Sequence, residues 1–241
     1  MKAGRKLARI LALVISLLAT TALVPRAATA ATPFKVLAFY TGPAEGDAAH
    51  VSFETEARTW FPKAGDQNGF TFTATTNWDM LNTLTAAQYQ VVMFLDDAPH
   101  SSAQRTGFQR YMENGGAFFG FHVSAFTTNG ADWDWYYNRF LGTGAFETNT
   151  WGPSSAVLAN GDPSHPAMRR VPAKYTSGVS EWYGWQHDLR QNPDIDVLAR
   201  SIRRVSPWAP SRARPGPAAT TRSCGATRTT RCSTPISATT T

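Results

Sequence analysis

The sequence predicts a single α/β domain built on a mostly parallel central sheet. Three short apolar runs, and one segment at 70–76 in which apolar residues alternate with threonine, are interleaved with helical segments along residues 34–121. Continuous apolar runs of this kind are typical of parallel strands that are buried on both faces. The chain of 241 residues is 42% hydrophobic, which is enough for one sizeable core and excludes a wholly disordered protein.

The predicted elements follow one another closely. Strands are expected at 34–40, 70–76, 89–95 and 117–121, and helices at 50–60 and 101–114. Thr41-Gly42-Pro43 ends the first strand. Ser101 or Ser102 is expected to cap the second helix, and Gly115-Gly116 to end it.

Ligands of parallel α/β sheets bind beyond the carboxyl ends of the strands. Those ends carry Thr41, Asp96-Asp97 and the segment from His122 to Ser124. A residue on a sharp turn from strand to helix is held exposed above the sheet, and here that residue is His122. It can act as a base, a metal ligand or a polar anchor, or it can simply hydrogen-bond a loop.

Further candidates lie later in the chain. Glu181 stands among aromatic residues, where burial would raise its pKa and suit it to acid or base catalysis, although a solvated strand edge is the alternative. His165 lies in a turn with two prolines, where capping the backbone is the simpler role. Aromatic residues around Trp133, Trp151 and Trp182 could form a sugar platform or plain core.

Metal and cofactor content are left open by the sequence. His50, Asp97, His122 and Glu181 could form a metal site, but no tight pair such as His-x-x-x-His supports one. Walker A, Gly-x-Gly-x-x-Gly and Gly-x-Ser-x-Gly motifs do not occur. The segment 31–202 has no cysteine, which excludes a cysteine nucleophile there. The oligomeric state is equally open.

The net charge of +6 belongs to the two ends of the chain. Residues 1–30 hold five basic residues and 203–241 hold seven, with no acid in either segment. The middle therefore keeps eleven of the 23 basic residues against all 17 acids and is acidic. It carries no basic stripe with interleaved aromatics, so nucleic acid is not an expected partner.

Residues 1–30 resemble a secretory signal peptide. A basic start is followed by the apolar stretch Ile10 to Val24 and by Ala28-Thr29-Ala30, a small-x-small cleavage site. A transmembrane anchor is the alternative, but the stretch is short for a full span. We expect cleavage after Ala30, secretion, and no stable membrane insertion afterwards.

Composition changes abruptly after Ile202. Residues 203–241 contain no Asp, Glu or Lys, and both cysteines of the chain lie there. A disordered low-complexity tail would explain this. A frameshift would also explain it, because the shifted frame permits aromatic and β-branched residues typical of strands and a Gly-His pair at the codons of Ser237 to Thr239. Either way, little stable structure is expected after about residue 204.

Four segments of the sequence together resemble the ThuA-like (trehalose utilisation) family. They are Lys35–Tyr40 followed by His50, the glycine-rich run Asn114–His122, the His-Pro turn Asp162–Ala167, and Glu181-Trp182-Tyr183 followed by Asn192-Pro193 and Val197-Leu198-Ala199. The resemblance covers about 34–202, in the order that the family has.

The resemblance implies a flavodoxin-like, three-layer fold similar to the class I glutamine amidotransferases. His122 stands where those enzymes hold cysteine, so amidotransferase chemistry is not expected. It also implies a secreted sugar-processing, hydrolase-like enzyme that acts on a glycoside or an oxidised sugar. A non-catalytic carbohydrate-binding module and an inactive remnant are the alternatives.

In the enzyme interpretation, His122 is the central base or ligand and Glu181 a second acid or base. The residues expected to contact substrate are His50, Asp97, Ser124, His165, Trp182 and Tyr183. The family ends with an aromatic strand and Gly-His, which this sequence lacks as written. The domain 31–202 is therefore expected to be incomplete at its C-terminus, and to be destabilised or inactive unless the frame is restored.

Overall fold

The computed structural model describes residues 32–149, 155–204, 222–227 and 231–233. The chain divides into Met1–Thr32 and Pro33–Thr241, and the second unit is the one described here. The predicted signal peptide and Trp151 lie outside the described residues. Among the described residues, no helix has the length and apolar character needed to cross a membrane.

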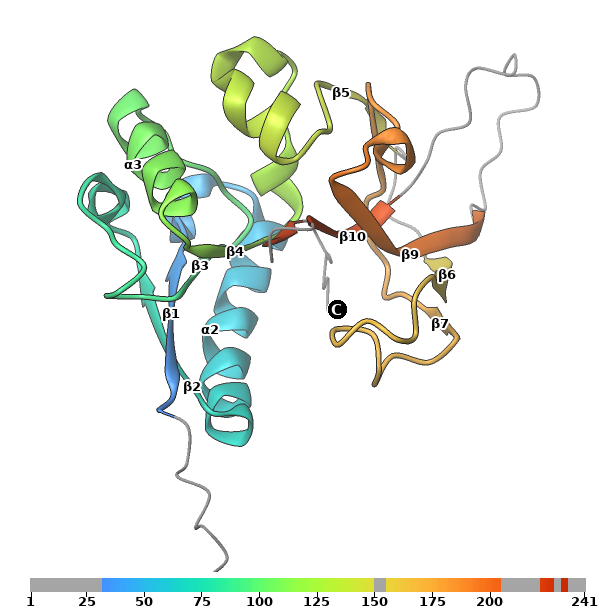
Figure 1. The fold of residues 1–241 in the computed structure, drawn as a ribbon, viewed down its shortest axis with the longest axis horizontal. Coiled ribbons are helices and arrows are strands. Elements are labelled where there is room, and N and C mark those ends of the chain that lie inside the picture. The colour runs from blue at the N-terminus through green and yellow to red at the C-terminus, as the bar shows by residue number, and fades with distance from the viewer. Residues whose placement is uncertain (1–31, 150–154, 205–221, 228–230, 234–241) are drawn as a thin grey trace, which may run out of the picture. The chain divides into compact units, whose positions relative to one another are not determined.

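A four-stranded parallel sheet forms the first half of this unit, as predicted (Figure 1). Its strands are β1 (Phe34–Phe39), β2 (Phe70–Thr75), β3 (Val91–Phe94) and β4 (Ala117–Gly120), in the spatial order β2-β1-β3-β4. Val36 of β1 lies opposite Phe72 on one side and Val91 on the other. All three pairings are parallel, so the carboxyl ends of the four strands meet at one edge.

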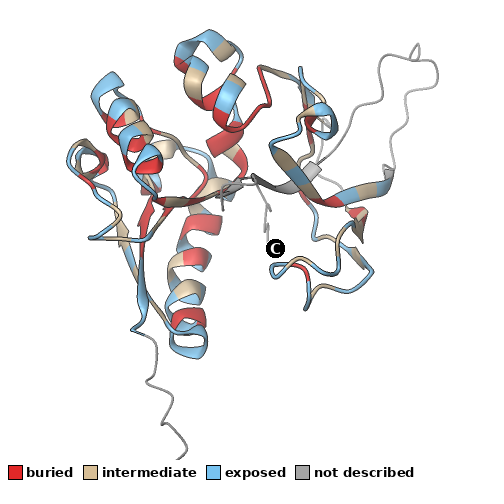
Figure 2. Ribbon diagram, in the orientation of Figure 1, coloured by how far each residue is buried: buried red, intermediate tan, exposed pale blue. Residues whose placement is uncertain are grey.

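Alternate residues of β1 pack on opposite faces of the sheet. Leu37 and Phe39 join the core on the side of α3 (Ser102–Glu113), which includes Phe108. Val36 and Ala38 join the core on the side of α2 (Ala48–Asn68), which includes Phe53. The buried residues of both helices accordingly face the strands (Figure 2). This two-sided burial explains why the strand reads as a continuous apolar run.

Helix α2 is longer than the predicted segment 50–60. Asp47 caps its N-terminus by accepting a hydrogen bond from the Ala49 N–H at 2.8 Å, and Gly69 ends it with φ of 74°. The helix continues past Pro62 because its last turns pack closely on β2. A Cβ at Gly65 would lie 2.4 Å from the Phe70 carbonyl oxygen, so only glycine allows this approach.

Helix α3 begins as predicted, and the structure selects Ser101 as the cap. The Ser101 side chain accepts from the Gln104 N–H, and the Gln104 side chain accepts from the Ser101 N–H, which is a complete capping box. Short helical turns occupy the connections. They are η1 (Gly42–Glu45), η2 (Trp78–Asn82), η3 (His122–Ala125), η4 (Gly130–Trp133), η5 (Trp135–Phe140, a π-helix) and η6 (Leu189–Gln191).

The second half of the unit is antiparallel, which the sequence did not predict. One sheet has the order β11-β10-β9-β6-β7, and β5 (Phe146–Asn149) pairs with β8 (Tyr183–Trp185). The other bounds are β6 (Ala156–Asn160), β7 (Lys174–Thr176), β9 (Ile195–Arg204), β10 (Arg222–Thr227) and β11 (Arg231–Ser233). Strands of three residues are too short to show a period in the sequence.

Strands β10 and β11 fall inside the segment for which the sequence predicts little stable structure. β10 pairs antiparallel with β9, so that Gly225 lies opposite Val197, and β11 pairs with β10. Ladder hydrogen bonds use backbone groups alone, so a segment poor in large apolar side chains can still make them. The rest of the predicted tail, 205–221, 228–230 and 234–241, lies outside the described residues.

Candidate active site

His122 lies at the point where β4 turns into η3. Its backbone has φ of 42°, a left-handed conformation that non-glycine residues adopt rarely. Two residues earlier, a Cβ at Gly120 would lie 2.5 Å from the Ser124 hydroxyl oxygen, so the turn requires glycine there. The imidazole of His122 is buried, with 6% of the residue exposed. The sharp turn predicted for His122 is therefore present, but the side chain is enclosed and not exposed.

Asp96 fixes the orientation of the His122 ring. It follows β3 with φ of 64°, which aspartate tolerates better than most residues. Its Oδ1 lies 2.9 Å from His122 Nδ1 and accepts a second bond, also 2.9 Å, from the Val123 N–H. Because an ionised carboxylate only accepts, this pairing assigns the proton to Nδ1 and leaves the Nε2 lone pair free in the neutral imidazole.

Glu181 lies beside Nε2 of His122, and Tyr183 covers one face of the His122 ring. Glu181 Oε2 lies 3.4 Å away, which is an ion-pair distance, yet Nε2 makes no hydrogen bond within the described part of the chain. A separation of 3.4 Å is long for a hydrogen bond, so the contact with Glu181 is electrostatic. Tyr183 stacks on the His122 ring with centroids 4.6 Å apart, and burial raises the pKa of the Tyr183 phenol far above its usual value.

His50 and Glu45 form the other wall of the site. His50 Nδ1 lies 2.5 Å from Glu45 Oε1, and the His50 and His122 rings meet edge to face at 5.3 Å. Burial raises the pKa of Glu45 to about 7, against the opposing effect of His50. Burial lowers the pKa of His50, but the charge of Asp96 and the bond to Glu45 outweigh it and raise this pKa above its usual value.

Three polar side chains thus converge, from the first turn of α2 (His50) and from the segments that follow β3 (Asp96) and β4 (His122). His50, Asp96 and His122 each offer one ligand atom, and these atoms lie within 4.8 Å of one another. They are the only such group of three or more histidine, cysteine and acidic residues among the residues that the structure describes. The arrangement can hold a proton between carboxylate and imidazole, or a metal ion in its place.

Three of the other predicted residues, Asp97, Ser124 and His165, make their hydrogen bonds away from this group. Asp97 accepts from the Thr41 hydroxyl and lies 3.1 Å from His100 Nε2, so the carboxylate that meets His122 is its neighbour, Asp96. Ser124 is buried, and its carbonyl accepts from the Tyr136 hydroxyl. His165 hydrogen-bonds within its own turn, where its Nδ1 accepts from the Ala167 N–H at 3.2 Å. Trp182 is half-buried beside Tyr183 in the sequence.

Sequence reasoning missed the structural role of two glutamates. Glu54 is completely buried and accepts from the N–H groups of Thr41 and Gly42, at 2.9 and 2.8 Å, which fixes the loop after β1. That loop leads into Glu45, the partner of His50. A carboxylate four residues after His50 lies on the same face of a helix, and this spacing was the available signal.

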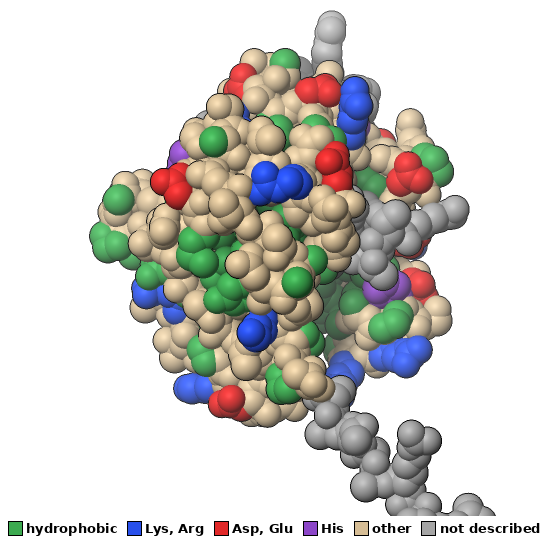
Figure 3. Space-filling model, turned by 60° about the vertical axis from the view of Figure 1, so that its left-hand side comes forward, with side chains coloured by type: hydrophobic (Ala, Val, Ile, Leu, Met, Phe, Trp, Pro, Cys, Tyr) green, Lys and Arg blue, Asp and Glu red, His purple; other side chains and the backbone are tan. Residues whose placement is uncertain are grey.

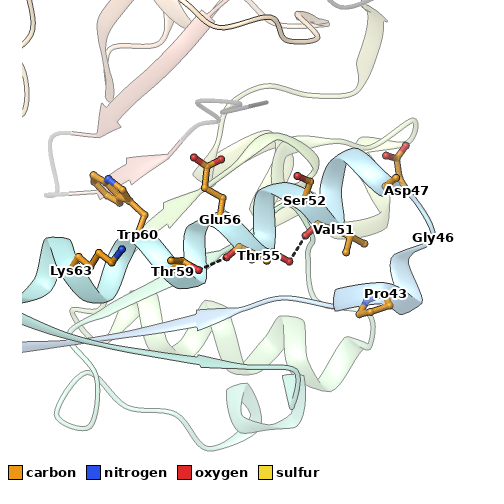
Figure 4. Close-up of a pocket in the computed structure, with 11 residues that line it drawn as sticks. Pro43, Gly46, Asp47, Val51, Ser52, Thr55, Glu56, Thr59, Trp60 and Lys63 are labelled. Carbon is orange, nitrogen blue, oxygen red and sulfur yellow. Dashed lines mark hydrogen bonds between the residues drawn. The ribbon is translucent and has the colours of Figure 1, made fainter. Parts of the chain in front are cut away.

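An open groove of about 840 Å³ runs along the exposed side of α2 (Figure 4). It begins beside Asp47, close in sequence to His50, and ends at Trp60 and Lys63. Trp60 is 58% exposed, which is unusual for so large an apolar side chain. On the molecular face in Figure 3, acidic and basic side chains are interspersed. The groove is lined by Pro43, Gly46, Asp47, Ala48, Val51, Ser52, Thr55, Glu56, Thr59, Trp60 and Lys63.

The chain is similar to several known proteins in sequence and in fold. The model of the family described as "ThuA: Trehalose utilisation" matches residues 35–234. The crystal structure of a ThuA-like protein from Bacteroides uniformis is 30% identical, with a TM-score of 0.72 over 86% of this chain and 83% of that one. Another, from Parabacteroides merdae, is 19% identical, with a TM-score of 0.51 over 70% of this chain and 68% of that one. No curated protein matches the chain.

These matches agree with the predicted fold class. The family match extends to residue 234 and so includes β10 and β11, whereas the segments that resemble the family in the sequence analysis end before residue 202.

Proposed function

Since the chain belongs to the ThuA (trehalose utilisation) family, we propose that it is a carbohydrate-processing, hydrolase-like enzyme that acts on a glycoside or an oxidised sugar. The observation that carries this proposal is the environment of His122. Its Nε2 is buried, lacks a hydrogen bond among the described residues, and lies 3.4 Å from the Glu181 carboxylate. A buried and unpaired nitrogen costs free energy in a resting protein, and such features concentrate at functional sites.

In this proposal, His122 is the central group, as base or as ligand. As a base, Nε2 takes a proton from a water molecule or a sugar hydroxyl, and Asp96 stabilises the imidazolium that forms. Glu181, partly exposed and on the open side of the ring, passes a proton to or from the leaving oxygen. His50, Trp182 and Tyr183 shape the pocket, and Asp97, Ser124 and His165 support it from further away.

The groove on α2, which His50, Asp96, His122 and Glu181 do not line, offers a separate surface on which a carbohydrate could bind. Sugar rings bind to aromatic faces through their apolar C–H surfaces, and the exposed ring of Trp60 supplies such a face at one end. Hydroxyl and carboxylate side chains line the same groove at Ser52 and Glu56 (Figure 4).

A substrate screen with matched variants tests the proposed function. Mass spectrometry follows product release from a panel of glycosides and oxidised sugars. Two proteins are compared, one with the sequence given above and one in which the reading frame after residue 202 is restored. His122→Ala should abolish turnover and Glu181→Gln should reduce it strongly, whereas His187→Ala, an exposed histidine, should not change it. Circular dichroism checks that each variant folds.

Turnover that survives His122→Ala would contradict the proposed role of this histidine. Binding of a polysaccharide without any product, unaffected by His122→Ala, would instead support a carbohydrate-binding module.

We also propose that the protein is exported. The basic start, the apolar stretch and the Ala28-Thr29-Ala30 site support this, and the structural unit begins at Pro33, shortly after the proposed cleavage point. N-terminal sequencing of protein from the medium or periplasm should give Ala31 as the first residue. A retained Met1 would contradict cleavage.

A further inference from the structure

We propose that His50, Asp96 and His122 bind one divalent metal ion of the zinc class, through two imidazole nitrogens and one carboxylate oxygen. The inference deepens the proposed function and rests on it, because it assigns His122 the role of ligand. Its structural basis is the convergence of these three side chains, with ligand atoms within 4.8 Å of one another.

The spacing of the ligand atoms fits an ion of this size. His122 Nδ1 and Asp96 Oδ1 lie 2.9 Å apart, with the proton of the hydrogen bond assigned to Nδ1. Two ligand atoms that are each about 2.0–2.1 Å from a tetrahedral zinc ion lie about 3.3 Å apart. Replacing that proton by an ion therefore needs a small widening of this pair. The edge-to-face contact of 5.3 Å brings the His50 ring against the same pair.

The far nitrogen of each histidine meets a carboxylate, as is usual for histidines that bind metals. His50 Nδ1 lies 2.5 Å from Glu45, which leaves Nε2 of His50 for the ion. His122 Nε2 lies 3.4 Å from Glu181. When Nδ1 of His122 binds the ion, Nε2 carries the proton and can donate it to Glu181. This pairing gives a hydrogen-bond partner to the buried Nε2, which makes no hydrogen bond among the residues that the structure describes.

The set of two histidines and one carboxylate also indicates which class of metal ion would bind. Nitrogen and oxygen ligands in this ratio suit zinc and similar transition metals better than Mg²⁺ or Ca²⁺, which prefer oxygen alone. Three protein ligands leave a position for water or for a substrate oxygen, and an ion there can activate the water or polarise the substrate.

Metal titration of the full chain tests this inference without an activity assay. After treatment with a chelator and dialysis, the protein is titrated with Zn²⁺ by calorimetry, and bound metal is counted by mass spectrometry. We expect one ion per chain, with release of protons. His50→Gln, Asp96→Asn and His122→Asn should each weaken Zn²⁺ binding by at least about 100-fold, and Glu45→Gln by about 10- to 100-fold. His187→Ala should bind like the unmodified chain.

Co²⁺ provides a spectroscopic readout, because its visible absorption reports direct coordination by nitrogen and oxygen ligands. If His122→Asn does not fold, as judged by circular dichroism, His50→Gln and Glu45→Gln decide the question. Absence of a stoichiometric Zn²⁺ site, or equal affinity in the ligand variants and His187→Ala, would overturn the inference.

The two proposals can fail separately. Loss of turnover in His122→Ala without any metal site would reject the inference and leave the proposed function standing, with His122 as the base. A confirmed metal site in a protein that converts none of the carbohydrates would reject the proposed function and leave the inference standing.

Discussion

Asp96 and His122 are joined by a hydrogen bond of 2.9 Å, and they are the two non-glycine residues with positive φ in the described part of the chain. Each follows a strand of the parallel sheet, and they are 26 residues apart. Such backbone conformations cost about 1–3 kcal/mol each and persist where the surrounding structure demands them. The pair therefore concentrates backbone strain at the same place as the candidate chemistry.

Substitution of Asp96 should reveal how much this carboxylate supports the turn. We expect Asp96→Ala to lower the free energy of unfolding of the metal-free protein by about 1–3 kcal/mol, because the Val123 N–H and His122 lose their acceptor. Asp96→Asn should cost less, since asparagine tolerates positive φ and keeps one acceptor oxygen. Urea unfolding followed by fluorescence measures both, and equal losses in the two variants would argue against this explanation.

Gly107 of α3 should not tolerate a methyl group. A Cβ there would lie 2.2 Å from the Leu81 carbonyl oxygen, because α3 packs directly on the backbone of η2. We expect Gly107→Ala to destabilise the protein by about 1–3 kcal/mol or more, although alanine favours helix. Thr106→Ala on the exposed side of the same helix is the control and should stay within about 0.5 kcal/mol. Thermal unfolding of the two variants measures their stability. A Gly107→Ala variant as stable as the unmodified protein would contradict the close packing of α3 on η2.

The capping box at Ser101 should be measurable. Ser101→Ala removes the acceptor for the Gln104 N–H and should lower stability by about 1 kcal/mol. Ser102→Ala, one residue along, should have little effect because Ser102 is the first helical residue. Denaturant unfolding measures the stability of both variants. A larger loss of stability in Ser102→Ala than in Ser101→Ala would show that Ser102 is the N-cap residue.

Glu54 should make stability depend on pH. Burial raises its pKa above the ordinary value of 4.5, outweighing the hydrogen bonds from Thr41 and Gly42 that lower it. A raised carboxyl pKa means that the folded protein holds this proton more tightly than the unfolded chain. Its contribution to stability is therefore complete below the unfolded pKa and is lost as pH rises through the folded pKa.

Comparison with Glu54→Gln isolates this titration. The unfolding free energy of the unmodified protein, minus that of the variant, should decrease as pH rises above the ordinary glutamate pKa of 4.5 and through the raised pKa of the folded protein. Loss of one hydrogen bond in the variant shifts the difference by an amount that does not depend on pH. A difference that stayed constant or increased with pH would contradict the raised pKa.

The parallel half of the fold was predictable because its signals are local. Strands β1, β3 and β4 are apolar runs, β2 alternates phenylalanine or alanine with threonine, and α3 carries its own cap at Ser101. The antiparallel half was not predictable from the sequence, because β6 pairs with β9 across a long stretch of sequence and a strand such as β7 has only three residues. Whether those segments form strands depends on their pairing partners in the folded protein and not on the local sequence pattern.

The candidate site was predictable in its position and not in its details. The strand ends indicated where polar groups would meet, and His122 and His50 do meet there. Asp96 and Asp97 are adjacent, and successive side chains point in different directions, so the sequence could not tell which one contacts His122. The spacing of Glu54 from His50 places both on one face of a helix, but it does not show that Glu54 binds the backbone groups of a loop. The frameshift after residue 202 stays a prediction.

The order of the elements along the chain has a consequence for translation and mutation. Glu45, His50, Asp96 and His122 all lie within the first 122 of the 241 residues, in the part of the chain that forms the parallel sheet and its connections, whereas Glu181 and Tyr183 come from the antiparallel half. A ribosome therefore completes the histidine cluster well before it reaches the strands that follow residue 155. A reading-frame lesion late in the gene would change β10 and β11 in every product, yet leave each codon of the cluster untouched.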